Sequence, residues 1–226
     1  MFSRCLSTRE TEIIGTIQAF VREKHAACEG HDYSHVLRVT NHAIEIAEKI
    51  AESVDPFVVI CGALFHDLGR VGTESGSMHG IRGAALVEQF LKASWVDKVT
   101  GKRIARVVVR HTPTSHMPPE TLEEKIVYDA DTLDRFGWIG ILRGIMGKKG
   151  SIEEIVEKII AKRSSDYDKL LLPISRHLGA QAHQDTVFFL ARLREEMNRR
   201  LEEIELILLP EKPYSAVAVS SSQDDG

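Results

Sequence analysis

The stretch ALFHDLGR, residues 63–70, closes an apolar run and sets a histidine directly beside an aspartate. Asp55 followed by Pro56 is a typical helix start, so we expect the run to form a helix that ends near this doublet. Either His66 or Asp67 would cost free energy if it were buried without a partner. The doublet therefore predicts polar partners elsewhere in the chain.

The remaining chain has the apolar spacing of helices. Apolar residues recur at steps of three and four, and the alternation typical of strands is nearly absent. Ser7 and Glu10 have the pattern of a capping box that opens a first helix. Further helices are expected over residues 33–53, 55–67, 79–93, 101–111, 122–144, 151–164 and 184–208. We predict an all-α, single-domain helical bundle over residues 1–209 and a loosely ordered tail over 210–226.

The chain has 226 residues, with 29 Lys and Arg against 33 Asp and Glu and a formal net charge of −4. Charges of both signs are interspersed, so no basic stripe suggests a nucleic acid polymer as a partner. Cys5, Cys28 and Cys61 share no close-spaced motif, which is typical of reduced thiols. No segment resembles a leader peptide, and none has the roughly 18 to 20 apolar residues of a membrane span. We therefore expect a soluble, cytoplasmic protein without a membrane partner.

Outside the doublet, four polar residues stand near the ends of apolar helices: His35, His79, His111 and Asp131. Imidazole nitrogens and carboxylate oxygens together suit Mn, Fe, Co, Ni or Zn. Each residue alone has an ordinary alternative. His79 and His111 could cap a helix or be solvated, and Asp131 could cap a helix that begins at Thr132.

The ordered set resembles the HD-domain superfamily of metal-dependent phosphohydrolases. That family has an upstream histidine, the HD doublet and a downstream aspartate, which match His35, His66-Asp67 and Asp131. The segments GHDYSHVLRV and VYDADTLDRFGWIGILRGI look like the small stand-alone HD hydrolases, some of which are nucleotide pyrophosphatases. The resemblance covers roughly residues 10 to 205 and implies an HD-type helical bundle.

Branches of the superfamily with two metals have two more histidines between the doublet and the last aspartate. They include the HD-GYP phosphodiesterases and the symmetrical diadenosine tetraphosphatases. His79 and His111 stand in those places, although the GYP signature is missing and a cyclic dinucleotide role is disfavoured. The resemblance implies one or two divalent transition-metal ions and these ligands: His35, His66, Asp67, His79, His111 and Asp131. In a site with two metals, Asp67 would bridge the ions.

Arginines near these ligands are candidate phosphate contacts. Arg38 lies one helical turn after the upstream histidine and Arg70 directly follows the doublet, so both rank before Arg82 and Arg110. The alternative for each is a solvated charge on a helix surface. With Asp67 to orient the attacking water, Arg38 and Arg70 complete the expected catalytic group.

The favoured function is hydrolysis of a phosphoester or phosphoanhydride bond in a small phosphorylated molecule, with a nucleotide as the favoured substrate. A metal ion would lower the pKa of a bound water and polarise the phosphoryl oxygen. Two alternatives stay open: a di-iron oxygenase of the HD type, and a nucleotide-binding sensor without turnover. The sequence names neither the substrate, the metal, the number of ions nor the oligomeric state.

Overall fold

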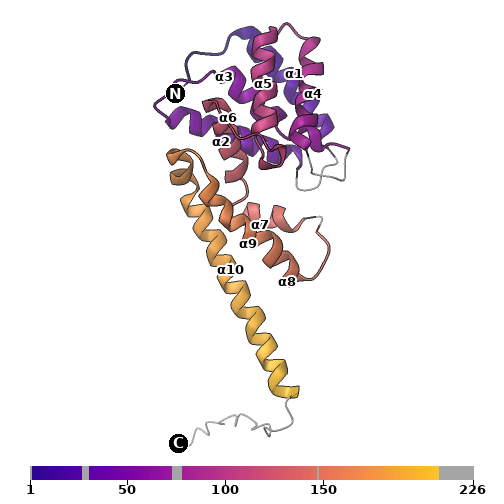
Figure 1. Cartoon of the computed structure of the whole chain (residues 1–226), viewed down its shortest axis with the longest axis vertical. Coiled ribbons are helices and arrows are strands. Elements are labelled where there is room, and N and C mark those ends of the chain that lie inside the picture. The colour runs from indigo at the N-terminus through magenta and orange to yellow at the C-terminus, as the bar shows by residue number, and fades with distance from the viewer. Residues whose placement is uncertain (1, 27–30, 73–77, 147, 209–226) are drawn as a thin grey trace, which may run out of the picture. The chain divides into compact units, whose positions relative to one another are not determined.

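The computed structural model describes residues 2–26, 31–72, 78–146 and 148–208. Within these ranges the regular structure is helical (Figure 1), and the one strand-like pairing is an isolated bridge between Phe2 and Val54. The prediction of an all-α fold is confirmed. No helix in this part of the chain combines the length and the apolar character that a membrane span needs.

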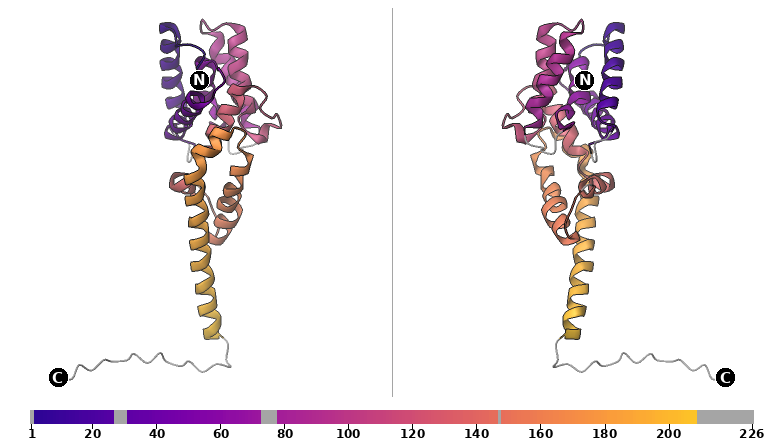
Figure 2. Two further views of the ribbon diagram at one scale, coloured as in Figure 1. Left: turned by 90° about the vertical axis from the view of Figure 1, so that its left-hand side faces the viewer. Right: turned by 90° about the vertical axis from the view of Figure 1, so that its right-hand side faces the viewer.

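Among the described residues, the first part of the chain forms six α-helices. Each has at least twelve residues, except the third, which is shorter and apolar. These elements are α1 (Thr8–Lys24), α2 (Tyr33–Lys49), α3 (Pro56–Phe65), α4 (His79–Lys92), α5 (Lys98–Arg110) and α6 (Leu122–Leu133). The 3₁₀ turns η1 (Leu68–Arg70) and η2 (Pro113–Ser115) follow α3 and α5. α4 and α5 lie side by side in every view (Figure 2).

The helix α3 is the centre of the core. Phe57, Leu64 and Phe65 are fully buried, and α1, α2, α5 and α6 all pack against this helix. Burial of one such side chain stabilises a fold by about 1.5–3 kcal/mol. The core therefore fixes the C-terminal end of α3, where His66 and Asp67 follow.

Local capping explains where α1 and α3 begin. Ser7 accepts from the backbone N–H of Glu10, and the Glu10 carboxylate accepts from the backbone N–H of Ser7. The Asp55 side chain accepts from the backbone N–H of Phe57 at 3.0 Å, with Pro56 in the first turn. Both predicted helix starts are confirmed.

The prediction of a single helix over residues 122–144 is wrong. The chain breaks after α6 and starts again as α7 (Gly137–Ile145). Gly137, the first residue of α7, has a φ of +67°, so one continuous α-helix cannot run from α6 through this position. Its backbone N–H donates to Oγ1 of Thr186 at 2.8 Å, a bond from outside the helix. The break frees the Asp134 side chain for the interactions described below.

Two later helices also differ from the prediction. Residues 151–164 form α8 (Ile152–Ile155), the π-helical segment η3 (Val156–Ile160) and α9 (Ala161–Ser164), followed by the 3₁₀ turn η4 (Ser165–Lys169). The last helix, α10 (Pro173–Leu208), begins eleven residues before the predicted start. The carboxylate of Asp129 accepts from the backbone N–H groups of Leu171 and Leu172, which holds the chain just before α10.

The chain divides into two compact units, residues 1–187 and 188–226. The predicted tail over 210–226 and Cys28 lie outside the described residues, and the extent of the helical domain stays a prediction. Cys5 is exposed and Cys61 is buried, and both are free thiols.

Candidate metal centre

The HD doublet lies at the end of α3. His66 is the C-terminal cap of α3, and Asp67 precedes η1. A Cβ atom on Gly69 would lie 1.9 Å from the carbonyl oxygen of His79 and 2.5 Å from the backbone nitrogen of Gly83. Only glycine therefore allows η1 to approach α4 so closely. This approach brings Asp67 next to the first residue of α4.

One group of ligand atoms comes from α2, α3 and α6. Nε2 of His35 lies 3.2 Å from Nε2 of His66 and 3.4 Å from Oδ1 of Asp131. Both histidines are fully buried and Asp131 is nearly so. One ligand atom from each of these residues lies within 4.8 Å of the others, so the group could hold a metal ion.

A second group comes from α4, the end of α5 and the doublet. Nε2 of His79 and Nε2 of His111 lie 3.1 Å apart, and Oδ1 of Asp67 is 3.3 Å from the former and 3.6 Å from the latter. All three side chains are buried. Their ligand atoms also lie within 4.8 Å of one another. The six residues that the resemblance implied thus come together in two groups of three.

Asp67 lies between the two groups. Its Oδ2 is 3.5 Å from Nε2 of His35, while its Oδ1 faces His79. Oδ2 also lies 2.6 Å from Nδ1 of His31, and Oδ1 accepts from Nε of Arg70 at 2.8 Å. Both carboxylate oxygens of Asp67 therefore have partners in the structure. His31, His35 and Asp67 form a third group whose ligand atoms lie within 4.8 Å.

Three histidines of the centre have Nδ1 engaged outside it. Nδ1–H of His35 donates to Oδ2 of Asp134 at 2.8 Å. Nδ1–H of His66 and of His111 donates to the backbone carbonyl three residues earlier, at 2.7 and 2.6 Å. A neutral imidazole protonated on Nδ1 has a lone pair on Nε2. The converging Nε2 lone pairs need a cation or a proton between them, which fits a metal centre.

Burial and neighbouring charges set the protonation of two histidines. Burial lowers the pKa of His66 to about 3, so its imidazole is neutral at neutral pH. Burial also acts to lower the pKa of His35, but hydrogen bonds with Asp131, Asp134 and Asp67 outweigh it and raise that pKa to about 9. The carboxylates around His35 thus favour positive charge there, which a metal ion would also provide.

Asp134 organises a layer behind His35. Besides His35, its carboxylate accepts from Nε of Arg38 at 2.7 Å and from Nη1 of Arg143 at 2.6 Å. The two arginines and His35 outweigh the burial of this carboxyl and lower its pKa to about 2. In the structure Arg38 therefore forms an ion pair with Asp134. A direct contact between Arg38 and a phosphate stays a prediction.

A cavity of about 430 Å³ opens beside the centre, and we call it the basic cavity. His31, Arg70 and Asp131 line it from the side of the ligand groups. Most of its other lining residues are cationic and come from the turn between α6 and α7, from α7 and from the segment 158–169. The cationic residues of the lining are Arg70, Arg135, Arg143, Lys158, Lys162, Arg163 and Lys169.

Salt bridges and hydrogen bonds join Asp131 and the later helices to the cationic side chains that line the cavity. Nη2 of Arg135 donates to Oδ2 of Asp131 at 2.7 Å, and its Nη1 donates to Oδ2 of Asp166 at 3.0 Å. Asp166 in turn accepts from Nζ of Lys169 at 2.5 Å. Nη1 of Arg163 donates to the carbonyl oxygen of Gly140 at 2.6 Å. Residues of the later helices are thereby held beside the ligands.

Sequence reasoning missed several of these residues. His31 stands four residues before His35, a spacing that could have suggested a shared site. Lys158 and Lys162 have the four-residue spacing of one helix face and Arg163 follows directly, yet nothing in the sequence ties this segment to the doublet. Asp134 gave no signal, because its role depends on the break between α6 and α7.

Arg110 and two further histidines, His42 and His183, have their neighbours outside the two groups of ligand atoms. Arg110 forms a salt bridge with Glu120 at 2.9 Å and contacts the carbonyl oxygen of Pro118. His42 lines a separate hollow together with Arg38. His183 stacks on Tyr167 with ring centroids 4.2 Å apart.

Comparisons with known proteins agree with this architecture. The family model described as HD domain matches residues 32–135. The uncharacterized protein YpgQ of Bacillus subtilis strain 168 is 28% identical over 179 residues, which cover 74% of this chain and 85% of YpgQ. A tRNA (cytidine(56)-2'-O)-methyltransferase of Picrophilus torridus is 33% identical over 129 residues, which cover 50% of this chain. This match covers 35% of the methyltransferase, so it concerns only a part of that protein.

Solved structures have the same fold. The crystal structure of Bacillus subtilis YpgQ in complex with ADP gives a TM-score of 0.67 at 25% identity and covers 84% of this chain and 97% of YpgQ. The crystal structure of a predicted HD superfamily hydrolase from an uncultured Thermotogales bacterium gives a TM-score of 0.58 at 25% identity. That match covers 83% of this chain and 98% of the other.

Proposed function

This chain belongs to the HD-domain superfamily, and we propose that it is a metal-dependent phosphohydrolase acting on a small phosphorylated molecule, with a nucleotide as the favoured substrate. The proposal combines two features: two groups of buried metal-ligand atoms joined by Asp67, and a cationic cavity beside them.

The basic cavity is the observation that supports a phosphorylated substrate. Its lining carries seven Lys and Arg side chains against the carboxylates of Asp131 and Asp166, a formal excess of five positive charges. Clefts lined by one sign of charge concentrate ligands of the opposite sign. Phosphate oxygens accept hydrogen bonds from guanidinium and ammonium groups. An uncharged oxygenase substrate would not use the excess positive charge of this lining.

A nucleotide is favoured by the similarity to YpgQ, whose crystal structure holds ADP. The volume of about 430 Å³ is in the range of small-molecule sites.

Three parts of the chain would act in the reaction. His35, His66, Asp67, His79, His111 and Asp131 would hold one or two divalent transition-metal ions. When bound, such an ion lowers the pKa of a water ligand and polarises a phosphoryl oxygen. Asp67, fixed by Arg70 and His31, would orient the attacking water. Arg70, Arg135 and the lysines of the cavity would offset the charge that grows on the phosphoryl oxygens.

A turnover assay tests the proposal. The full chain, freed of metal and then loaded with Mn, Fe, Co, Ni or Zn, would be offered nucleotides, dinucleoside polyphosphates and generic phosphoesters. Release of phosphate or pyrophosphate is expected with at least one metal, and Asp67→Ala should abolish it. Asp168→Ala is the matched control, because Asp168 is exposed and does not line the cavity. Oxygen consumption by the iron-loaded protein without phosphate release would favour the oxygenase instead.

A further inference from the structure

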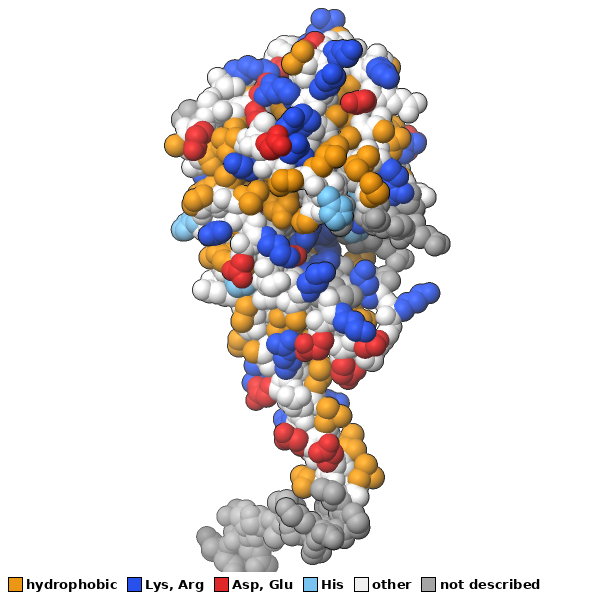
Figure 3. Space-filling view, in the orientation of Figure 1, with side chains coloured by type: hydrophobic (Ala, Val, Ile, Leu, Met, Phe, Trp, Pro, Cys, Tyr) orange, Lys and Arg blue, Asp and Glu red, His pale blue; other side chains and the backbone are white. Residues whose placement is uncertain are grey.

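The last turns of α10 leave large apolar side chains uncovered. Leu201, Ile204 and Leu208 expose 58%, 53% and 72% of their surface. Hydrophobic side chains lie on the surface near the end of this helix, among acidic ones (Figure 3). Apolar side chains that gather on an exposed surface often mark an interaction site.

These side chains continue a coiled-coil pattern. Successive helical residues are about 100° apart, so Leu190, Met197, Leu201, Ile204 and Leu208 fall within roughly 60° of one another around the helix. Their steps of seven, four, three and four residues are those of a heptad seam. Leu190 is buried and Met197 is half-buried, whereas the three later residues are exposed. We call Leu201, Ile204 and Leu208 the open seam.

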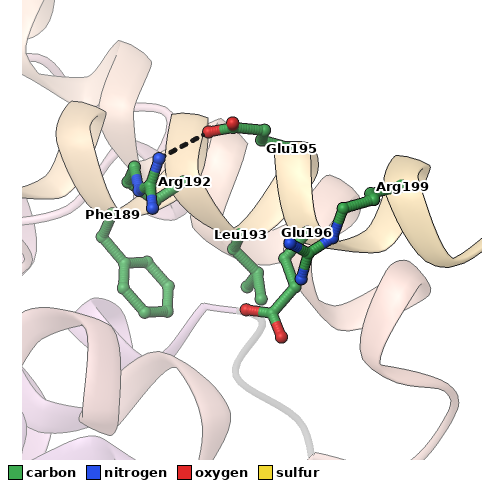
Figure 4. Close-up of a pocket in the computed structure, with 6 residues that line it drawn as sticks. All are labelled: Phe189, Arg192, Leu193, Glu195, Glu196 and Arg199. Atoms are coloured by element: carbon green, nitrogen blue, oxygen red, sulfur yellow. Dashed lines mark hydrogen bonds and ion pairs between the residues drawn. The ribbon is translucent and has the colours of Figure 1, made fainter. Parts of the chain in front are cut away.

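A hollow on α10, in the turns before the open seam, is lined by both apolar and charged side chains. It has a volume of about 230 Å³ and is lined by residues of α10 alone (Figure 4). Phe189 and Leu193 point to one side of the helix, while the ion pair of Arg192 with Glu195, at 2.7 Å, lies on another side. Because charged side chains make up most of this lining, we assign the hollow no ligand and restrict the interaction to the open seam.

We propose that the open seam pairs with the open seam of a second copy of this chain as a short parallel coiled coil. Arg200 and Glu205 stand on opposite flanks of the seam. In a parallel pair, a flank residue faces the residue five positions later on the other helix, so Arg200 meets the partner's Glu205. Two-fold symmetry forms this ion pair twice. An antiparallel pair centred on the seam would instead bring Glu205 beside the partner's Glu205, and like charges repel.

The charge of this segment argues against a membrane surface. Residues 188–208 contain four arginines and five glutamates, a net charge of −1. Amphipathic helices that bind anionic membranes are rich in Lys and Arg on the polar face. Both charge signs here form pairs along the helix, such as Arg200 with Glu196 at 3.1 Å. A solvated protein interface fits this pattern better.

Sedimentation equilibrium of the full chain over a range of concentrations tests the pairing. We expect a monomer–dimer equilibrium whose dissociation constant rises about tenfold or more in Leu201→Asn, because two copies of a buried leucine are lost. Leu206→Asn is the matched control, since Leu206 is 57% exposed but lies on the opposite side of the helix. A chain that stays monomeric at all concentrations, or equal effects of the two variants, would overturn the proposal.

Charge reversal tests the parallel orientation. Arg200→Glu should weaken the dimer, and adding Glu205→Arg to the same chain should restore it to near the original dissociation constant. Absence of restoration would overturn the parallel pairing. Vesicles of phosphatidylcholine and phosphatidylserine provide the competing test. Binding of a monomeric chain to them, lost in Leu201→Asn, would replace the proposal by a membrane contact.

Discussion

Nδ1 of His35 lies 2.8 Å from Oδ2 of Asp134, in a carboxylate–imidazole pair that is almost fully buried. The bond fixes the tautomer of His35 and turns its Nε2 toward Asp131 and Asp67. Outer partners of this kind orient metal ligands and raise their basicity. Asp134 itself is held by Arg38 and Arg143.

Removal of Asp134 should therefore weaken metal binding although Asp134 is not a proposed ligand. Asp134→Ala is expected to lower the metal affinity of a folded protein by about 10- to 100-fold. Competition with a chelator measures the affinity, and circular dichroism checks the fold. Asp168→Ala serves as the control with an exposed carboxylate. A folded Asp134→Ala protein with unchanged affinity would exclude this supporting role.

The second prediction concerns the number of metal ions that the protein binds. His79→Ala or His111→Ala should reduce the metal-to-chain ratio from near two to near one, because both residues belong to the group on Oδ1 of Asp67. Elemental analysis of purified protein gives the ratio. If the wild-type ratio is near one and neither change alters it, the two groups do not hold two separate ions. Loss of substrate affinity in both variants would then assign these histidines to the substrate.

Metal affinity should depend on pH through His35. Its pKa is raised to about 9 in the metal-free protein, so the imidazole is protonated at pH 7.5 and must lose that proton to bind a metal. Affinity is thus expected to rise with pH up to about 9 and then to level off. Calorimetry at pH 7.5 in buffers of different ionisation enthalpy should detect release of about one proton per His35 site. A heat of binding that is independent of the buffer would contradict this protonation.

The cationic side chains that line the basic cavity should contribute to substrate binding. Lys162→Ala is expected to raise KM for the phosphorylated substrate about three- to tenfold and to leave kcat nearly unchanged, because an exposed cation contributes a modest charge interaction. The effect should shrink at high salt. Lys149→Ala is the control, since Lys149 is exposed and does not line the basic cavity. Equal KM values for both variants would place the substrate elsewhere.

Most helices of the first half, and the residues that form the two groups of potential ligand atoms, could be predicted from the sequence for a physical reason. The HD doublet follows an apolar helix whose start is set by Asp55 and Pro56, so its place in the fold depends on local signals. The break before Gly137 was missed because the apolar spacing continues across it, and the side chain that accepts from the Gly137 N–H, Thr186, lies 49 positions away. Asp134 was missed for the same reason.

The lysines that line the basic cavity could not be placed from the sequence either. Lys158 and Lys162 come from the segment around η3, where a π-helical turn interrupts the α-helix. Such turns are rare and often lie at functional sites. Periodicity alone predicted a regular helix there and could not place its charged face next to His31 and Asp131.

The most direct test of the account is the hydrolysis rate of metal-free protein during titration with a divalent metal, measured for the wild type and for His66→Ala. We expect a rate that starts near zero, rises with added metal and levels off when the ligand groups are filled. His66→Ala should stay folded, with lower thermal stability in the presence of metal than the wild type, and should show no rise. Full hydrolysis by the metal-free wild type, or an unchanged titration of His66→Ala, would contradict a reaction that depends on this metal centre.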